Sequence, residues 1–385
     1  MKIAIVGTGA VGGWYAALLA EAGHEVHCLA RSDFETIRAH GLTIRNKGTE
    51  RVIRVTSATP DATSIGPCDL VVVTIKSTSN KALPVLITPL LGQNTLVVTL
   101  QNGMGNVEAL AKLLPAERIV AGLCFVCINR LAPAVIDTSL AGYVRMAAST
   151  GPINPAVETC VDTFAAAGVD CQAETSLESV LWKKLCWNIP FNGLSIAGGC
   201  ITTDLILANP LLNERAYVLM KEVQAAAVAR GHGFEDAHIK RQFVVTVGMG
   251  PYRPSSLIDF VEGREVEVEG IWGEPLRRGL AAGVKMPETE KLVAEIKARI
   301  AARGESRRVS RGYGRRFVRC SESQRAYPKR HRGFSVPNRR ETPRSSGASP
   351  DPAVFRQSQG EQSRPHGGRH RRQWAPWQRH SHVAS

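Results

Sequence analysis

The sequence has no long hydrophobic run. No stretch of its 385 residues approaches the ~20 consecutive apolar residues that a membrane-spanning helix requires. The apolar segment near the N-terminus, Lys2–Val6, is short and leads into a glycine-rich turn, which is typical of a β-strand rather than a signal peptide. We therefore expect a cytoplasmic protein with no membrane partner.

The sequence also lacks the spacing of a metal site or a disulfide framework. Its nine cysteines are scattered, and Cys124-x-x-Cys127 has no second pair with which to form a zinc site. The ten histidines and the acidic residues show no HxxxH-type spacing with a nearby carboxylate. We interpret the cysteines as small buried thiols and expect no bound metal.

Residues 304–385 contain no Leu, Ile or Met, and their basic residues are 18 Arg and one Lys. Such a segment cannot bury enough apolar surface to offset its ordering entropy, so we expect a disordered Arg-rich tail. Its composition differs so much from the rest of the chain that an out-of-frame extension is one explanation for it.

This tail carries the whole net charge. It holds 19 Lys and Arg against 5 Asp and Glu, whereas residues 1–303 hold 29 of each sign. The basic balance therefore gives no reason to expect nucleic acid as a partner of the folded part. The alternative from another function class is a nucleic-acid-binding protein that uses the tail, with Tyr327, Trp374 and Trp377 available for stacking.

The first 31 residues predict a dinucleotide site of the Rossmann type. A strand precedes a GxGxxG turn, apolar residues at helical spacing follow it, and a second strand covers Glu25–Leu29. The first glycine allows a tight turn, the second lets the backbone approach a pyrophosphate, and the third lets the helix pack closely on its strand. Free N–H groups of the first helical turn would face the anion. The candidate cofactor-binding residues are Gly7, Thr8, Gly9, Ala10, Val11 and Gly12.

The end of the second strand favours NADPH over NADH. An NAD enzyme usually has an Asp or Glu there to hold the ribose hydroxyls, and this chain has Ala30-Arg31. The guanidinium of Arg31 can stack on the adenine and pair with the 2′-phosphate. Two alternatives stay open, because Asp33 lies close by and because Arg31 can be read as an ordinary exposed loop residue.

Two further buried strands each end next to a polar side chain. Asp69–Ile75 is followed by Lys76, and Leu96–Leu100 is followed by Gln101 and Asn102. Ligands of open parallel sheets bind outside the carboxyl ends of the strands, so Lys76 and Asn102 are candidate site residues. The alternative is that Lys76 is a solvated strand end and Asn102 only a turn former.

Long helical patterns replace strand patterns from about Ser176 onward. Shorter β-rich segments before that point are expected to complete the sheet, at Ile119–Cys127 and Tyr143–Ala147, and apolar stripes then predict helices at Leu177–Gly198, Asn213–Arg230 and Met286–Arg303. The sequence thus predicts an α/β fold. Residues 1–175 form a Rossmann-type NADP-binding domain, residues 176–303 an all-α substrate and catalytic domain, and residues 304–385 the tail.

The helix predicted at Leu177–Gly198 carries three polar residues spaced four apart: Lys184, Asn188 and Asn192. This spacing places an ammonium and two amides on one face of a helix. Either the stripe is a satisfied buried network or solvated face, or it lines a groove where the amides hold a substrate and the lysine donates a proton. Pro190 is expected to bend or loosen the helix between the two asparagines.

These residues together resemble the ketopantoate reductase (2-dehydropantoate 2-reductase) family over roughly residues 1–303. The resemblance rests on the glycine turn, on Gln101-Asn102-Gly103-Met104-Gly105, on the Lys184–Asn192 helix, and on two later segments, Tyr252–Asp259 and Gly263–Glu269. It implies a Rossmann domain followed by a helical domain, with the site between them.

The resemblance also implies roles for individual residues. Lys184 matches the general acid and Glu267 the acidic partner near it, so these two are the candidate catalytic residues. Asn188, Asn192 and Ser255 match substrate contacts, while Lys76 and Asn102 match groups near the nicotinamide and the substrate. The implied reaction is NADPH-dependent reduction of 2-dehydropantoate to pantoate, a step of pantothenate biosynthesis.

Two departures from the family pattern leave the substrate open. The best-studied branch of the family has a further substrate-binding Asn where this chain has Thr202, and the Ile189-Pro190-Phe191 segment also differs. The alternatives are therefore a reductase of another small 2-oxo acid or ketone and an NADPH-binding regulatory protein without turnover. The sequence does not determine the oligomeric state, and a homodimer stays open.

Overall fold

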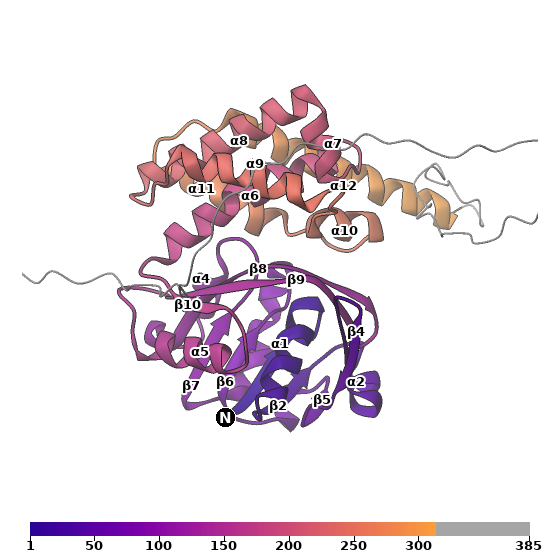
Figure 1. Cartoon of the computed structure of the whole chain (residues 1–385), viewed down its shortest axis with the longest axis vertical. Coiled ribbons are helices and arrows are strands. Elements are labelled where there is room, and N and C mark those ends of the chain that lie inside the picture. The colour runs from indigo at the N-terminus through magenta and orange to yellow at the C-terminus, as the bar shows by residue number, and fades with distance from the viewer. Residues whose placement is uncertain (313–385) are drawn as a thin grey trace, which may run out of the picture. The chain divides into compact units, whose positions relative to one another are not determined.

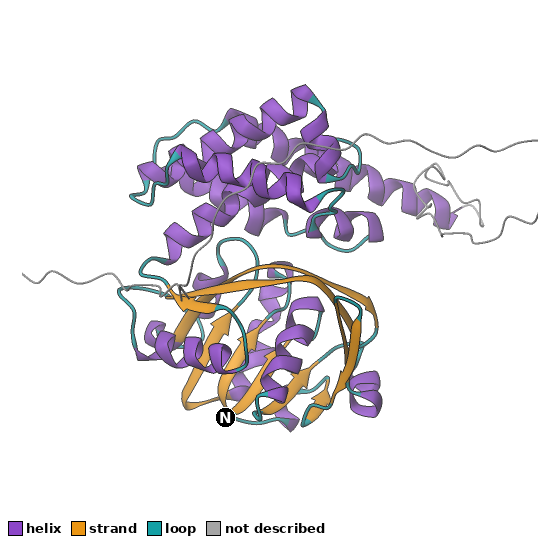
Figure 2. Ribbon diagram, viewed as in Figure 1, coloured by secondary structure: helices purple, strands orange, loops and turns teal. Residues whose placement is uncertain are grey.

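The computed structural model describes residues 1–312, and it gives side-chain burial as far as Gly304. These residues belong to one compact unit, in which strands of the N-terminal part are followed by helices (Figures 1 and 2). The strands are β1 (Lys2–Val6), β2 (Glu25–Leu29), β3 (Leu42–Asn46), β4 (Thr49–Ile53), β5 (Ser57–Thr59), β6 (Cys68–Val73), β7 (Leu91–Thr99), β8 (Ile119–Ala132), β9 (Val135–Ala148) and β10 (Cys171–Ala173).

All of these strands form one sheet. Its order is β4-β3-β9-β8-β7-β6-β1-β2-β5, and β10 pairs with β9 outside that path. Neighbouring strands are parallel along the part of the sheet that runs β8-β7-β6-β1-β2-β5. The pairs β3 with β4 and β8 with β9 are antiparallel. The carboxyl ends of β1, β2, β6 and β7 therefore lie at one edge, where the predicted site residues follow them.

Helices cover both faces of this sheet. α1 (Ala10–Glu21) and α5 (Pro155–Ala166) contribute residues to one apolar core, and α3 (Leu83–Ile87) and α4 (Asn106–Leu110) to the core on the other face. A short helix, α2 (Phe34–His40), connects β2 to the β3–β4 hairpin. Burial on both faces explains why the central strands read as continuous apolar runs in the sequence.

The last part of the sheet is larger than predicted. β8 and β9 are 14 residues each and pair along most of their length, whereas the sequence indicated only Ile119–Cys127 and Tyr143–Ala147. The outer halves of both strands are partly exposed and mix polar with apolar residues, so they lack the pattern of a buried strand. The turn of the extended hairpin lies next to the N-cap of α2, because the backbone N of Ala134 donates to the Asp33 carboxylate at 3.1 Å, and the N-terminal end of β9 pairs with β3.

The helical part begins directly after β10 and has its own apolar core. Its helices are α6 (Leu177–Ala197), α7 (Thr203–Ala208), α8 (Pro210–Ala229), α9 (Asp236–Met249), α10 (Ser255–Glu262), α11 (Glu274–Ala281) and α12 (Pro287–Gly312). α6 is central to this core and carries many of its fully buried residues, Trp182 and Phe191 among them. α6 continues through Pro190, which removes one backbone donor without ending the helix.

The final helix is longer than the sequence predicted. We expected it to stop at Arg303–Gly304, and α12 continues to Gly312. A glycine inside a helix costs only about 1 kcal/mol, and a helix already nucleated and packed can extend through polar residues at little further cost. The predicted tail therefore overlaps the last turns of α12, and the rest of it, residues 313–385, lies outside the described residues.

Truncation after Gly312 is expected to leave a folded, cooperatively unfolding protein. Every strand and helix described above is retained, and the removed segment contains no Leu, Ile or Met with which to complete a core. Thermal unfolding followed by circular dichroism, on the truncated and full chains at equal concentration, checks this. A broad transition or a loss of several degrees in Tm would show that residues 313–385 belong to the fold.

Candidate functional site

The glycine loop between β1 and α1 is shaped by close backbone contacts. Gly7 has φ +100°, a left-handed conformation that favours glycine, and a Cβ there would lie 2.7 Å from the backbone N of Ile75. A Cβ on Gly12 would lie 2.2 Å from the carbonyl oxygen of Gly7. These two positions therefore require glycine for packing within the protein itself.

Gly9 differs, because a Cβ on this residue would meet nothing within 4 Å. It is the N-cap of α1, no side chain caps this end, and the first turn contains no acidic residue. The N–H groups of the first turn, together with the positive end of the helix dipole, are thus free to bind an anion. This end of α1 fits the pyrophosphate of a dinucleotide, with Gly7, Thr8, Gly9, Ala10, Val11 and Gly12 forming the cradle.

The end of β2 lies beside this loop, since the Gly7 N–H donates to the carbonyl oxygen of Leu29 at 3.1 Å. Arg31 follows it and is exposed. Asp33 is the acidic residue that kept NADH as an alternative cofactor in the sequence analysis. It is only 2% exposed and forms an ion pair with Arg130. Within the segment between β2 and α2, the exposed charged residue is therefore Arg31.

Lys184 and Asn102 meet at the carboxyl end of the sheet. The Nζ of Lys184, on α6, donates to Oδ1 of Asn102 at 2.7 Å, which joins the helical part to the turn after β7. Burial lowers the pKa of Lys184, while Cys124 and Glu267 nearby act in the opposite direction. A half-buried ammonium with a lowered pKa, held at an amide, is suited to donate a proton.

Glu267 lies at this junction and is 6% exposed. Its Oε1 accepts hydrogen bonds from the backbone N of Ser77 at 2.8 Å and from the Ser77 hydroxyl at 2.9 Å. Ser77 begins the short 3₁₀ helix η2 (Ser77–Ala82) directly after Lys76. Glu267 thus fixes the segment after β6 while its charge supports the ammonium form of Lys184.

Lys76 pairs with a residue to which the sequence assigned no role. Its Nζ forms an ion pair with the carboxylate of Asp259 on α10, and that carboxylate also accepts from Nε of Arg264 at 2.8 Å. Asp259 is 4% exposed. Its position four residues after Ser255, one helical turn further along α10, was the signal that could have identified it.

A local irregularity before α11 holds the Asn102 turn in place. η5 (Glu269–Gly273) is a π-helical turn, and Pro275 follows it with no N–H to donate back to Gly270. The carbonyl oxygen of Gly270 instead accepts from the backbone N of Met104 at 2.8 Å. A Cβ on Gly103 would lie 2.2 Å from that same oxygen, so glycine is needed for this approach.

The three predicted substrate contacts lie in different environments. Asn188 and Asn192 are both buried on α6, and Oδ1 of Asn192 accepts from the backbone N of Ser256 at 3.1 Å. Ser255 is exposed at the first position of α10. Asn192 therefore also serves as a cap for α10, and it positions Ser255 relative to α6.

Thr202, where the resemblance predicts a departure from the best-studied branch, is the N-cap of α7. Its hydroxyl donates to the carboxylate of Asp204. The hydroxyl of Thr202 is therefore engaged by a neighbouring side chain, and it does not accept a hydrogen bond from the first turn of α7.

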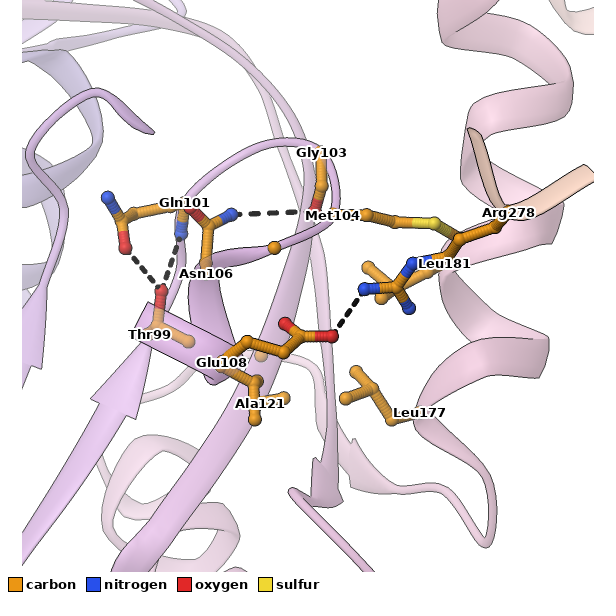
Figure 3. A pocket seen from close by; sticks show the side chains of 13 residues that line it. Thr99, Gln101, Gly103, Met104, Asn106, Glu108, Ala121, Leu177, Leu181 and Arg278 are labelled. Carbon is orange, nitrogen blue, oxygen red and sulfur yellow. Dashed lines mark hydrogen bonds and ion pairs between the residues drawn. The ribbon is translucent and has the colours of Figure 1, made fainter. Parts of the chain in front are cut away.

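A pocket lies next to the Asn102 turn (Figure 3). It is lined by the end of β7, the turn, α4, β8, the first turns of α6 and one residue of α11, which are Thr99, Gln101, Gly103, Met104, Gly105, Asn106, Val107, Glu108, Ala121, Gly122, Leu177, Leu181 and Arg278. Arg278 forms ion pairs with Glu108 on α4 and, at 3.1 Å, with Glu178 on α6. Neither of the candidate catalytic residues, Lys184 and Glu267, lines this pocket. We therefore interpret it as a gap in the packing around the turn and not as the substrate site.

Among residues 1–312, no group of three or more His, Cys, Asp and Glu side chains is arranged to hold a metal ion. The same part of the chain contains no helix that is both long and apolar enough to cross a membrane. Eight of the nine cysteines lie in the described part of the chain, and seven of them are free thiols: Cys28, Cys68, Cys124, Cys127, Cys160, Cys171 and Cys186.

Comparison with known families matches the two parts of the chain in turn. Residues 3–151 match the family model described as "Ketopantoate reductase PanE/ApbA", and residues 176–300 match its C-terminal counterpart. The chain belongs to the ketopantoate reductase family. The members of this family are dinucleotide-dependent oxidoreductases, and the residue-level resemblance found in the sequence is confirmed at the level of the family.

Individual ketopantoate reductases match over most of their length. A curated 2-dehydropantoate 2-reductase from Nostoc sp. is 36% identical over 302 residues, which are 77% of this chain and 94% of the relative. The crystal structure of 2-dehydropantoate 2-reductase from Geobacter metallireducens GS-15 is 38% identical, with a TM-score of 0.75 over 77% of this chain and 99% of that one. A D-mandelate dehydrogenase solved with NADH and anilino(oxo)acetate shares the fold, with a TM-score of 0.73 at 21% identity, and covers 78% of this chain and 99% of its own.

Proposed function

We propose that this protein reduces 2-dehydropantoate to pantoate with NADPH. The observation that carries the proposal is the junction of Lys184, Asn102 and Glu267 at the carboxyl ends of β6 and β7, beside the uncapped N-terminus of α1. A proton donor next to a dinucleotide cradle is what reduction of a carbonyl requires. The names of the relatives from Nostoc and Geobacter support 2-dehydropantoate as the substrate.

The residues of the cradle would hold the cofactor, which supplies a hydride when bound. Gly7 to Gly12 bind the pyrophosphate through backbone N–H groups, and Arg31 binds the 2′-phosphate that distinguishes NADPH from NADH. Lys76 and Asn102 follow β6 and β7 and lie on the nicotinamide side of the cradle.

Lys184 donates the proton that completes the reduction. The carbonyl oxygen of the substrate would take its proton from the Lys184 Nζ, which would be left as a neutral amine, while the cofactor would supply the hydride for the carbonyl carbon. The lowered pKa of Lys184 makes this transfer easier, and Asn102 directs the ammonium. Glu267 keeps the lysine protonated before the reaction and orients the segment that carries Lys76.

Asn188, Asn192 and Ser255 are proposed to bind the carboxylate and hydroxyl groups of the substrate. Their amide and hydroxyl groups form uncharged hydrogen bonds, which suit a small polar substrate. These groups do not determine which side chain the 2-oxo acid carries. The hydroxyl of Thr202 is engaged by Asp204, and this position holds a substrate-binding Asn in the best-studied branch of the family. This difference supports a second candidate function, reduction of another small 2-oxo acid at the same site.

A substrate panel tests the proposal. Purified protein is mixed with NADPH and 2-dehydropantoate or another 2-oxo acid, and kcat/KM is measured from the loss of NADPH absorbance. We expect the largest kcat/KM for 2-dehydropantoate. Strong turnover of a different 2-oxo acid, with negligible turnover of this one, would support the second candidate, and tight NADPH binding without any turnover would support a regulatory role. Light scattering on the same sample distinguishes a monomer from a homodimer.

Arg31→Asp is expected to shift the cofactor preference from NADPH toward NADH. The substitution removes a partner of the 2′-phosphate and supplies a carboxylate that can accept from the ribose hydroxyls. A hydrogen bond to a charged group contributes about 1.5–3 kcal/mol, so the NADPH affinity should fall by about one to two decades. Dissociation constants for both cofactors, from nucleotide fluorescence, check this. An unchanged NADPH affinity would remove Arg31 from the site.

A further inference from the structure

Asp33 occupies a position at which a carboxylate could bind the ribose of a dinucleotide. It lies 21 residues after Gly12, and dinucleotide-binding domains that use NAD commonly place their ribose-binding acid about 20 residues beyond the glycine motif. The end of β2, four residues earlier at Leu29, is hydrogen-bonded to Gly7 of the glycine loop. A free carboxylate here would therefore lie near the 2′ position of the bound nucleotide.

The Asp33 carboxylate is instead occupied within the protein. Its Oδ1 accepts from the Ser32 hydroxyl at 2.6 Å, and its Oδ2 accepts from Nη1 of Arg130 at 2.6 Å and from the backbone N of Ala134 at 3.1 Å. Burial raises the pKa of Asp33, but these hydrogen bonds and the Arg130 charge outweigh it and lower the pKa overall. The carboxylate is thus ionised, buried and satisfied.

Arg130 reaches Asp33 from far along the chain. It lies near the outer end of β8, and Ala134 lies in the turn to β9, so both donors come from the extended β8–β9 hairpin. The Arg130 side chain remains 40% exposed. The hairpin tip therefore places a cation on the only acidic residue between β2 and α2, which follows the exposed Arg31 by two residues.

We propose that Arg130 is a specificity-determining residue for the cofactor, which neutralises Asp33 so that the 2′-phosphate of NADPH meets Arg31 without repulsion. The inference rests on the proposed function, because it places the dinucleotide at the glycine loop. A carboxylate left unpaired beside a dianionic phosphate repels it, whereas the uncharged ribose hydroxyls of NADH are not repelled. The ion pair therefore strengthens NADPH binding by removing this repulsion, and it leaves NADH binding nearly unchanged.

The test is a double-mutant cycle with Arg130→Met and Asp33→Asn, read out as the dissociation constants of NADPH and NADH from nucleotide fluorescence. We expect Arg130→Met to weaken NADPH binding about tenfold and to change NADH binding much less. Adding Asp33→Asn to Arg130→Met removes the carboxylate that has lost its cationic partner and should restore NADPH binding to near the wild-type value. Arg51→Met, which breaks the exposed ion pair with Glu21 at the far end of α1, is the matched control and should leave both constants unchanged.

Two results would overturn the proposal. An unchanged ratio of the NADPH and NADH constants in Arg130→Met would show that the ion pair has no part in selection. Weak NADPH binding that persists in the double variant would show that Arg130 contacts the phosphate directly. If thermal unfolding shows that Arg130→Met does not fold, the NADPH affinities of Asp33→Asn and of the double variant are compared instead. The proposal predicts that these two affinities are equal, and a weaker affinity in the double variant would contradict it.

Failure of the proposed function looks different. In that case the wild-type protein would show no preference for NADPH, and Arg31→Asp would leave the NADPH constant unchanged.

Discussion

Replacing Lys184 by alanine is expected to lower kcat by about 10²–10⁴-fold, which is the usual contribution of a positioned general acid. Its Nζ is the ammonium held at Asn102, and its lowered pKa suits donation to an alkoxide. The dissociation constant for NADPH should change little, because the proposed contacts of the cofactor are the glycine loop and Arg31. Steady-state kinetics and fluorescence titration of the same preparation separate the two effects.

Lys183→Ala is the matched control for this variant. Lys183 is exposed on the same helix, about 100° around the axis from Lys184, and its contact with His238 uses the backbone carbonyl, which the substitution retains. We expect nearly unchanged kinetics. If Lys183→Ala were as damaging as Lys184→Ala, or if Lys184→Ala kept near-normal turnover, Lys184 would not be the proton donor.

Replacing Glu267 by glutamine is expected to lower kcat about 10²-fold at neutral pH, the lower end of the contribution of a general acid. Glutamine retains an oxygen that can accept from the backbone N and hydroxyl of Ser77, so the fold of this segment should be kept while the charge is lost. The nearby negative charge raises the pKa of Lys184, and its removal leaves burial to lower that pKa further.

The sign of the pH effect follows from this charge. With Lys184 as the proposed proton donor, reduction requires its protonated form, so kcat/KM should fall as the pH rises through the pKa of Lys184. In Glu267→Gln that pKa is lower, and the alkaline decline of kcat/KM should begin at a lower pH than in the wild type. Glu267→Asp should restore the wild-type pH profile in part. Glu265→Gln, at an exposed neighbouring position, is the control, and an identical pH profile in Glu267→Gln and wild type would rule out the electrostatic role.

The parts of the fold that the sequence predicted well are those with strong local patterns. β1 and β2 have the predicted bounds, and α6 begins at the predicted residue. Continuous apolar runs and a glycine turn leave little choice for the local structure. The outer halves of β8 and β9 were missed because their pairing is set by each other and by β3, over a long separation in the sequence.

Part of the geometry of the candidate site also follows from the sequence. Spacing and resemblance indicated Lys184, Asn102 and Glu267, and the structure places the first two in direct contact. The helical spacing from Ser255 points to Asp259, but its pairing with Lys76, like that of Asp33 with Arg130, could not be found in this way, because each pair joins residues more than 90 positions apart. Charge pairing across such distances depends on the tertiary fold and leaves no periodicity in the sequence.

The most direct measurement is the rate of NADPH oxidation by the purified full chain with 2-dehydropantoate, compared between wild type and Lys184→Ala, with pantoate identified as the product. We predict that the wild type forms one pantoate for each NADPH oxidised and that the variant retains NADPH binding while losing at least about 10²-fold in kcat. No oxidation of NADPH by the wild-type protein with 2-dehydropantoate, under conditions in which NADPH binds, would contradict the proposed function.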